Sequence, residues 1–482
     1  MKRLPLLLSL VLAIPASLLA ADRPNVVMIC VDDMNAYAAK KQYPLIQTPA
    51  IDRLKAQSTF FPNAACNSPV CNPSRSSFFS GLYPHTTGAY LNGSDGWNRS
   101  EILKQIKNLP EHFQANGYVT WGAGKMLHNQ ISDEREYAMW SNAPTYQGGF
   151  GPFGDEEHQY GSRFRSIQGW TGPDTDFPDV KNANGAIDFL QEEHEMPFFL
   201  FYGLWRPHSP YTAPGRFFDQ YDESDFDFPP GRLEGDLDDV PELGRLLTDG
   251  LHKYEGFDIP REALIKRFLW AYAANTSFAD WNVGRVLEAL DNSPYADNTI
   301  VVFFSDNGFH NSEKERWGKA TLWDLSACIS MMVRVPGQQA RTSPATVSLV
   351  DLYPTLVDYC GIPAPDHKLD GHSFVPVLED PTASWAYPAF TSYGVEYASV
   401  RDTAYRYIRY PDGSEELYEY ASDPWEFTNR SDDPGLEPVK ERLRQYIPAE
   451  WAPSTGGRLE VPRDMEKVMR PPTPWDHLKP NS

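Results

Sequence analysis

Three continuous runs of apolar residues mark the strands that we expect at the centre of this protein. They cover residues 25–31, 197–204 and 299–304. A strand that is buried on both faces of a parallel sheet shows such a run, whereas a strand with one solvated face alternates apolar with polar residues. Polar residues follow each run within two positions, and sheets of this kind place their functional sites at the carboxyl ends of their strands.

Helical patterns separate the runs, at residues 181–193 and 262–290, and Thr48-Pro49 begins a further helix. Strands that alternate with helices predict an α/β sheet covered on both faces. Two segments rich in Gly, Pro, Asp and aromatic residues, 141–178 and 207–260, are expected to be long surface loops or lids.

The pattern changes from about residue 391. Short aromatic segments at 391–393, 405–410 and 416–420 are separated by turns and predict antiparallel strands, with a helix around 436–446. The last thirty residues are rich in proline and are expected to be extended. We therefore predict a large catalytic domain over residues 22–395 and a small antiparallel-sheet subdomain with an extended tail over residues 396–482.

Residues 1–21 have a basic start, a leucine-rich run and a small-residue end, which together predict a secretory signal peptide. We therefore expect a secreted or periplasmic protein. No second apolar stretch has the length of a membrane span, so no stable membrane insertion is expected.

The formal net charge is −22. This acidity argues against a nucleic-acid partner, and it means that any pocket for an anion must be locally basic. The five cysteines are too few for a disulfide scaffold. Cys30 and Cys328 lie in apolar surroundings and are expected to be packed thiols, and a disulfide between Cys66 and Cys71 is not expected.

The pentapeptide Cys71-Asn72-Pro73-Ser74-Arg75 is the most specific chemical signal. Pro73 suits a first helical turn and Gly81 suits the end of the same helix, so the pattern places Cys71 at a helix N-terminus. Free N–H groups there favour an anion, and Arg75 adds a planar, permanently charged fork suited to sulfate or phosphate. The alternative is a buried cysteine at the start of a structural helix.

Two pairs of oxygen ligands follow predicted strands, Asp32-Asp33 and Asp306-Asn307. All-oxygen sets suit a hard cation such as Ca²⁺ or Mg²⁺, although each pair taken alone is also typical of a solvated turn. Four further side chains can hold an oxyanion or exchange a proton, and taken singly each is also typical of a solvated loop: Lys125, His128, His208 and Lys319.

The order of these motifs, DDMN, CNPSR, GKMLH, RPHSP, SDNG and WGKATLW, resembles the type I sulfatases of the alkaline-phosphatase superfamily. The resemblance runs from Pro24 to about Asn429. It is strongest to the iduronate-2-sulfatase branch and its bacterial polysaccharide-sulfatase relatives. It implies a large mixed, mainly parallel sheet between helices and a smaller C-terminal antiparallel sheet.

The resemblance also implies a sulfuric ester hydrolase that acts on a sulfated carbohydrate. Cys71 would be converted to formylglycine, whose hydrated aldehyde attacks sulfur, by a formylglycine-generating enzyme or an anaerobic maturase. Ca²⁺, or Mg²⁺ in its place, would be held by Asp32, Asp33, converted Cys71, Asp306 and Asn307. Arg75 and Lys125 would stabilise the formylglycine, His128 would assist sulfate release, and His208 and Lys319 would contact the substrate sulfate, His208 as leaving-group acid.

One position departs from the iduronate branch, which often has His where this chain has Asn307. Asn is a good oxygen ligand, so the departure concerns substrate identity rather than the metal. Three further residues, His310, Glu313 and Lys314, are expected either to line the substrate pocket or to lie in a solvated loop.

Two other functions stay open at this point. One is a phosphodiester or phosphonate monoester hydrolase of the same superfamily, although a dianionic phosphoryl group is usually met by two metals. The other is a catalytically dead carbohydrate-binding protein with unconverted Cys71. The sugar, the sulfate position, exo or endo action and the oligomeric state do not follow from the sequence.

Overall fold

The computed structural model describes residues 23–94, 96–128, 134–141, 148–248, 251–380 and 382–457. The predicted signal peptide and most of the predicted extended tail lie outside the described residues. Within the described part of the chain, no helix is both long enough and apolar enough to cross a membrane.

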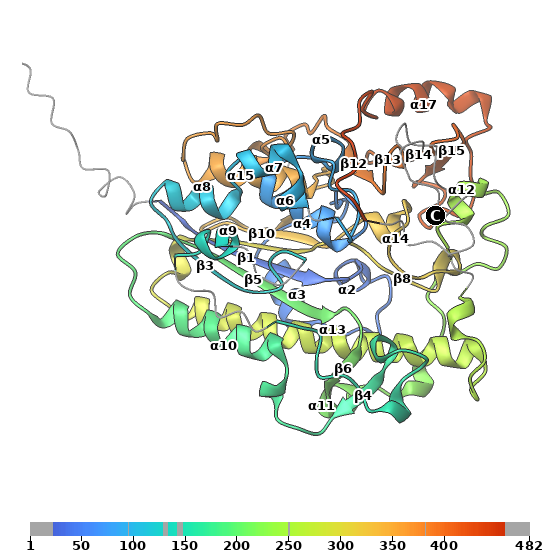
Figure 1. Cartoon of the computed structure of the whole chain (residues 1–482), viewed down its shortest axis with the longest axis horizontal. Coiled ribbons are helices and arrows are strands. Elements are labelled where there is room, and N and C mark those ends of the chain that lie inside the picture. The colour runs from blue at the N-terminus through green and yellow to red at the C-terminus, as the bar shows by residue number, and fades with distance from the viewer. Residues whose placement is uncertain are drawn as a thin grey trace, which may run out of the picture.

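A seven-stranded sheet forms the centre of the molecule (Figure 1), in the order β11-β2-β10-β7-β1-β5-β3. Strands β7, β1, β5 and β3 run parallel, and β10 is antiparallel to both of its neighbours. The mixed, mainly parallel sheet is therefore confirmed. Its strands are β1 (Asn25–Asp32), β2 (Thr59–Phe61), β3 (Val119–Gly124), β5 (Phe198–Pro207), β7 (Thr299–Ser305), β10 (Met331–Arg334) and β11 (Arg341–Thr342).

Helices cover both faces of this sheet, as the uninterrupted apolar runs predict. All eight residues of β1 are buried, and alternate side chains enter two separate cores. Val27 and Ile29 face α3 (Pro49–Lys55), α10 (Pro178–Gln191) and α13 (Arg261–Asp291). Val26 and Met28 face the opposite layer, formed by α4 (Cys71–Ser80), α8 (Leu109–Ala115) and α15 (Leu352–Tyr359).

The two segments expected to be surface loops are more ordered than the sequence suggested. Strand β4 (Ile167–Trp170) pairs in parallel with β6 (Tyr211–Pro214). Their aromatic residues pack on α13 in a third core. The high Gly and Pro content of these segments therefore reflects tight turns between short elements rather than an absence of packing.

A four-stranded antiparallel sheet follows, in the order β12-β13-β14-β15, and confirms the predicted C-terminal sheet. One face packs on α17, and the other packs against residues of the large sheet domain such as Val70 and Trp323. The sheet begins before residue 396, where we place the start of the small subdomain, and that division stays a prediction. The elements are β12 (Ala389–Ser392), β13 (Ala398–Arg401), β14 (Tyr405–Arg409), β15 (Glu415–Glu419) and α17 (Glu437–Arg444).

Short elements connect these layers. They are α2 (Tyr37–Lys40), α5 (Pro84–Thr87), α6 (Gly96–Arg99), α7 (Glu101–Gln105), α9 (Glu134–Ala138), α11 (Gly215–Phe218), α12 (Glu242–Arg245), β8 (His310–Asn311), β9 (Trp317–Gly318), α14 (Asp324–Ala327) and α16 (Val375–Glu379).

Candidate active site

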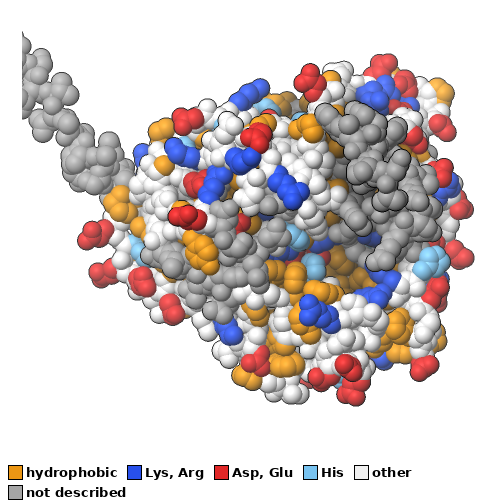
Figure 2. All heavy atoms as spheres, viewed as in Figure 1, with side chains coloured by type: hydrophobic (Ala, Val, Ile, Leu, Met, Phe, Trp, Pro, Cys, Tyr) orange, Lys and Arg blue, Asp and Glu red, His pale blue; other side chains and the backbone are white. Residues whose placement is uncertain are grey.

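The predicted site residues converge at the carboxyl ends of the four parallel strands. Every one of these strands supplies at least one of them, and α4 and the segment after β9 supply the rest. Figure 2 shows a hollow on the corresponding face that contains histidine side chains and is bordered by hydrophobic and basic side chains. The residues in question are Asp32, Asp33, Cys71, Arg75, Lys125, His128, His208, Asp306, Asn307 and Lys319.

Cys71 is the first residue of α4, as predicted, and Gly81 ends that helix in a left-handed conformation (φ 69°). The Cys71 side chain is almost fully buried, and its Sγ lies 3.3 Å from Oδ1 of Asp32 and 2.7 Å from Nζ of Lys319. Burial raises the pKa of the Cys71 thiol, and Asp32 raises it further. Burial therefore disfavours the thiolate, which is the nucleophilic form of a cysteine.

Arg75 lies one helical turn further along α4 and is completely buried. Its Nε donates to Oδ2 of Asp306 at 2.8 Å, and Nη1 donates to the carbonyl oxygens of Lys125 and Met126. Nη2 has no hydrogen-bond partner among the described residues. Because an unpaired buried guanidinium nitrogen is costly, this atom is available for an anion bound beside residue 71.

Two adjacent carboxylates at the end of β1 point into the same site. Consecutive side chains of a strand point to opposite faces, but Asp33 adopts a left-handed backbone (φ 61°) that breaks this alternation. Oδ2 of Asp32 accepts from Lys125, and Oδ1 of Asp33 accepts from Lys319. Burial opposes ionisation of Asp32, yet the surrounding positive charges, first that of Lys125, hold its pKa well below the usual range.

Close contact between two strand ends positions Lys125. A Cβ added to Gly203 would lie 1.9 Å from the carbonyl oxygen of Lys125, and one added to Gly124 would lie 1.9 Å from the carbonyl oxygen of Gly203. Gly124 also has φ 77°. Glycine at both positions therefore allows β3 and β5 to approach closely enough to direct Lys125 onto Asp32.

The donor set fits a hard divalent cation. Ligand atoms of Asp32, Asp33 and Cys71 lie within 4.8 Å of one another, and all three residues are buried. Asn307 is fully buried, and its Oδ1 has no hydrogen-bond partner among the described residues, while its Nδ2 donates to Asp33 at 2.8 Å. A buried carbonyl oxygen without a donor is a fitting ligand for Ca²⁺ or Mg²⁺.

His208 and His128 occupy the same site but have different partners. Nδ1 of His208 lies 2.6 Å from the carbonyl oxygen of Ser209, and Nε2 lies 3.6 Å from Oδ2 of Asp33. Because the Ser209 carbonyl accepts the Nδ1 proton, Nε2 is the nitrogen directed toward the site. Burial lowers the pKa of each histidine to about 3. Nδ1 of His128 has no described partner.

The C-terminal sheet fixes the segment that carries Lys319. Trp323 donates through Nε1 to Glu416 of β15 at 2.8 Å. Asp324 accepts from Arg406 of β14 at 2.7 Å, and its backbone N–H donates to Glu426 at 2.7 Å. These groups are buried or nearly so, so the small sheet holds the chain on the C-terminal side of Lys319.

His310, Glu313 and Lys314 are neither solvated nor placed among the catalytic residues, which corrects the expectation of a solvated loop. All three are buried. His310 is bonded to Thr321, Glu313 accepts from Tyr37, and Lys314 donates to Asp236 at 2.7 Å. They line a small enclosed cavity together with residues near Trp425.

Two residues that support the site were missed by the sequence analysis. Asp179, in the first turn of α10, accepts backbone hydrogen bonds from Trp205 (2.8 Å) and Arg206 (3.1 Å) and so fixes the end of β5 before His208. Phe150 packs on His208 with ring centroids 4.5 Å apart. An acidic residue in a helix start and a Phe in a loop carry no distinctive sequence signal.

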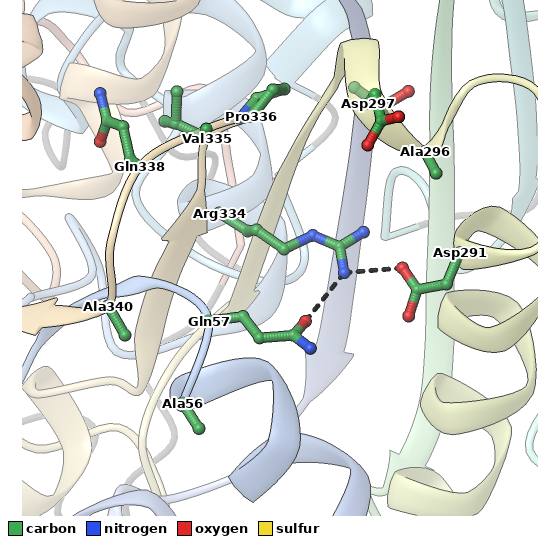
Figure 3. A pocket seen from close by; sticks show the side chains of 12 residues that line it. Ala56, Gln57, Asp291, Ala296, Asp297, Arg334, Val335, Pro336, Gln338 and Ala340 are labelled. Carbon is green, nitrogen blue, oxygen red and sulfur yellow. Dashed lines mark hydrogen bonds and ion pairs between the residues drawn. The ribbon is translucent and has the colours of Figure 1, made fainter.

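A separate pocket lies at the other end of the strands, beside the start of β7 and the end of β10 (Figure 3). Arg334 donates there to Gln57 at 3.1 Å and to Asp291 at 2.8 Å. It contains none of the predicted catalytic residues.

This fold and site define a hydrolase of the alkaline-phosphatase type, with a helix N-terminus and several oxygen ligands at the carboxyl edge of a mixed sheet. The sulfatase family model matches residues 24–362, and a model described as N-sulphoglucosamine sulphohydrolase, C-terminal, matches residues 312–451. The chain therefore belongs to the sulfatase family and is a sulfuric ester hydrolase. The second match includes both Lys319 and the C-terminal sheet.

Named relatives agree with this family. A sulfatase of Formosa agariphila is 34% identical over 89% of this chain and 87% of that protein. Iduronate 2-sulfatase of Mus musculus is 28% identical over 72% of this chain and 70% of that protein.

Solved structures share the fold. The phosphonate monoester hydrolase of Agrobacterium radiobacter has a TM-score of 0.71 at 21% identity, over 88% of this chain and 94% of that one. A protein solved in complex with its substrate D-glucosamine-2-N,6-O-disulfate has a TM-score of 0.68 at 21% identity, over 88% of this chain and 96% of that one.

Proposed function

We propose that this protein removes sulfate from a sulfated carbohydrate outside the cytoplasm, with a formylglycine made from Cys71 as the nucleophile and Ca²⁺ as its metal. The observation that carries the proposal is the position of Cys71 at the start of α4, in contact with Asp32 and Lys319. Because burial disfavours the thiolate of Cys71, conversion to an aldehyde hydrate would supply the nucleophile at this position.

The basic residues bind the anionic group. The site balances three carboxylates, on Asp32, Asp33 and Asp306, against three cations, on Arg75, Lys125 and Lys319. A divalent ion would make this locally positive, which offsets the acidity of the whole chain and favours a sulfate monoanion. When bound, the ion polarises a sulfate oxygen and lowers the pKa of the residue-71 hydroxyl.

The two histidines then divide the proton transfers. His208 is directed into the site through Nε2 and would give a proton to the leaving sugar oxygen. His128 would take a proton from the residue-71 side chain when sulfate is released and the aldehyde re-forms. Arg75 and Lys125 would hold that side chain, and Lys319, which already contacts Cys71, would bind a sulfate oxygen.

The names of relatives support a carbohydrate substrate. One relative is an iduronate 2-sulfatase, and one structural neighbour was solved with a disulfated glucosamine. We expect the matured protein to release sulfate from at least one defined oligosaccharide in a panel of sulfated glycosaminoglycans and algal polysaccharides, measured by ion chromatography. Release from aryl sulfates alone, with no saccharide accepted, would contradict the carbohydrate assignment.

The structural likeness to a phosphonate monoester hydrolase supports a second candidate. Comparing turnover of an aryl sulfate, an aryl phosphate diester and a phosphonate monoester by the same matured preparation separates the two. The dominant substrate by kcat/KM decides the assignment.

Replacing Asn307 with alanine is expected to lower divalent-ion affinity at least about tenfold, because it removes an oxygen ligand from the donor set. The measurement is metal content after dialysis, together with the rise in Tm on addition of Ca²⁺. Asn282→Ala removes another fully buried amide, in α13 and remote from the donor set, and should leave both unchanged. An active preparation that holds no divalent ion would contradict the metal assignment.

A further inference from the structure

A continuous series of aromatic rings leads away from His208. The His208 ring packs on Phe150 (centroids 4.5 Å apart), Phe150 on Phe164 (5.5 Å), and Phe164 on Phe153 (5.2 Å). Phe150 also lies 5.7 Å from Nζ of Lys125. The first ring of the series therefore borders the catalytic residues, and the last two lie further out along one wall.

Arg163 lies over the outer end of this series. Its guanidinium carbon is 4.6 Å from the centroid of Phe153 and 5.3 Å from that of Phe164, and the side chain is exposed. Stacking on two rings restricts a long side chain that would otherwise lose conformational freedom on binding a ligand. It leaves the edge of the planar fork, with its N–H donors, open to solvent.

The positive charge of Arg163 has no carboxylate partner in the described part of the chain. Acidic residues nearby in sequence have other partners: Asp155 accepts from Gln168 at 2.9 Å, and Glu157 lies 3.5 Å from His158. In a chain of net charge −22, a restrained and unpaired arginine beside the site is suited to a ligand anion.

We propose that Arg163 forms a specificity subsite for a second anionic group, a sulfate or a carboxylate, on the saccharide whose scissile sulfate lies at residue 71. This inference rests on the proposed function. Two ring contacts and one cation–π contact connect the guanidinium to His208, so we expect it to meet a neighbouring sugar unit rather than the reacting atoms. Arg163 then contributes to binding rather than to the chemical step.

The experiment measures wild type and Arg163→Gln with three probes. One is a monosaccharide that carries only the scissile sulfate, and the other two are disaccharides with the same scissile sulfate plus either a second sulfate or a carboxylate. The variant is expected to raise KM for the doubly anionic probes roughly five- to tenfold, with kcat unchanged and the monosulfated probe unaffected. The loss should shrink in 0.5 M salt, since screening weakens exposed ion pairs.

Arg216→Gln is the matched control, because Arg216 also stacks on two aromatic rings, Phe217 and Trp281, but pairs with Asp174 at 2.6 Å. It should change KM for none of the probes. Whether the sulfate or the carboxylate disaccharide responds more strongly identifies the second group. Equal losses on the monosulfated probe and the disaccharides, or no loss on any of them, would overturn the subsite and leave the proposed function standing. A matured wild type that desulfates no saccharide overturns the proposed function, and the subsite with it.

Discussion

Replacing Cys71 with alanine is expected to reduce sulfate release by more than about 10⁴-fold, as removal of a catalytic nucleophile does in other hydrolases. The reason lies in the position of the side chain. Residue 71 begins α4 between Asp32 and Lys319, and its Sγ contacts both of them. The fold should persist, because only a small side chain is lost from a polar site.

Mass spectrometry gives this prediction a second readout. In active wild-type protein, the peptide that carries residue 71 should be lighter than its thiol form by roughly 18 Da, the change from a thiol to an aldehyde. Cys66→Ala is the matched control, since Cys66 is equally buried but bonds only weakly, to the carbonyl oxygen of Ser326 at 3.5 Å. It should keep both the mass change and the activity. Full activity with an intact thiol at residue 71 would contradict the nucleophile assignment.

The central fold could be predicted because its signals are local. The apolar runs that became β1, β5 and β7 are long, and burial on both faces removes the polar residues that would otherwise interrupt them. Strands β2, β10 and β11 were not predicted, since they have only two to four residues. At that length, composition carries little information, and pairing with a neighbouring strand decides the structure.

The site could be predicted residue by residue but not in its contacts. The motifs identified Arg75 and Asp306, yet their ion pair joins residues 231 positions apart. The roles of Asp179 and Phe150 follow only from the folded structure, which places Asp179 of α10 beside the end of β5 and Phe150 beside His208. The sequence left His310 and Lys314 either in the substrate pocket or in a solvated loop, whereas both are buried, because closeness in sequence to a catalytic motif does not determine exposure.

His208 tests how the leaving group departs. A sugar alkoxide is a poor leaving group and needs a proton in the transition state, whereas a phenolate of low pKa needs it far less. His208→Ala is therefore expected to reduce turnover of a sulfated sugar by about 10²–10⁴-fold, with a clearly smaller loss on an activated aryl sulfate. The measurement is kcat/KM for both substrates with one preparation of each variant.

The geometry supports this role for His208 and gives its control. Ser209 accepts from Nδ1, so Nε2 faces the site and carries the transferable proton only when the ring is an imidazolium; an anionic substrate there would favour that form by countering the lowering of the His208 pKa that burial causes. His85→Ala removes another half-buried histidine, one that packs on Tyr83 and Phe390 at the small sheet, and it should affect both substrates little. If His208→Ala slows the sugar and the aryl sulfate equally, the imidazole binds sulfate or maintains structure, and the proton comes from another group.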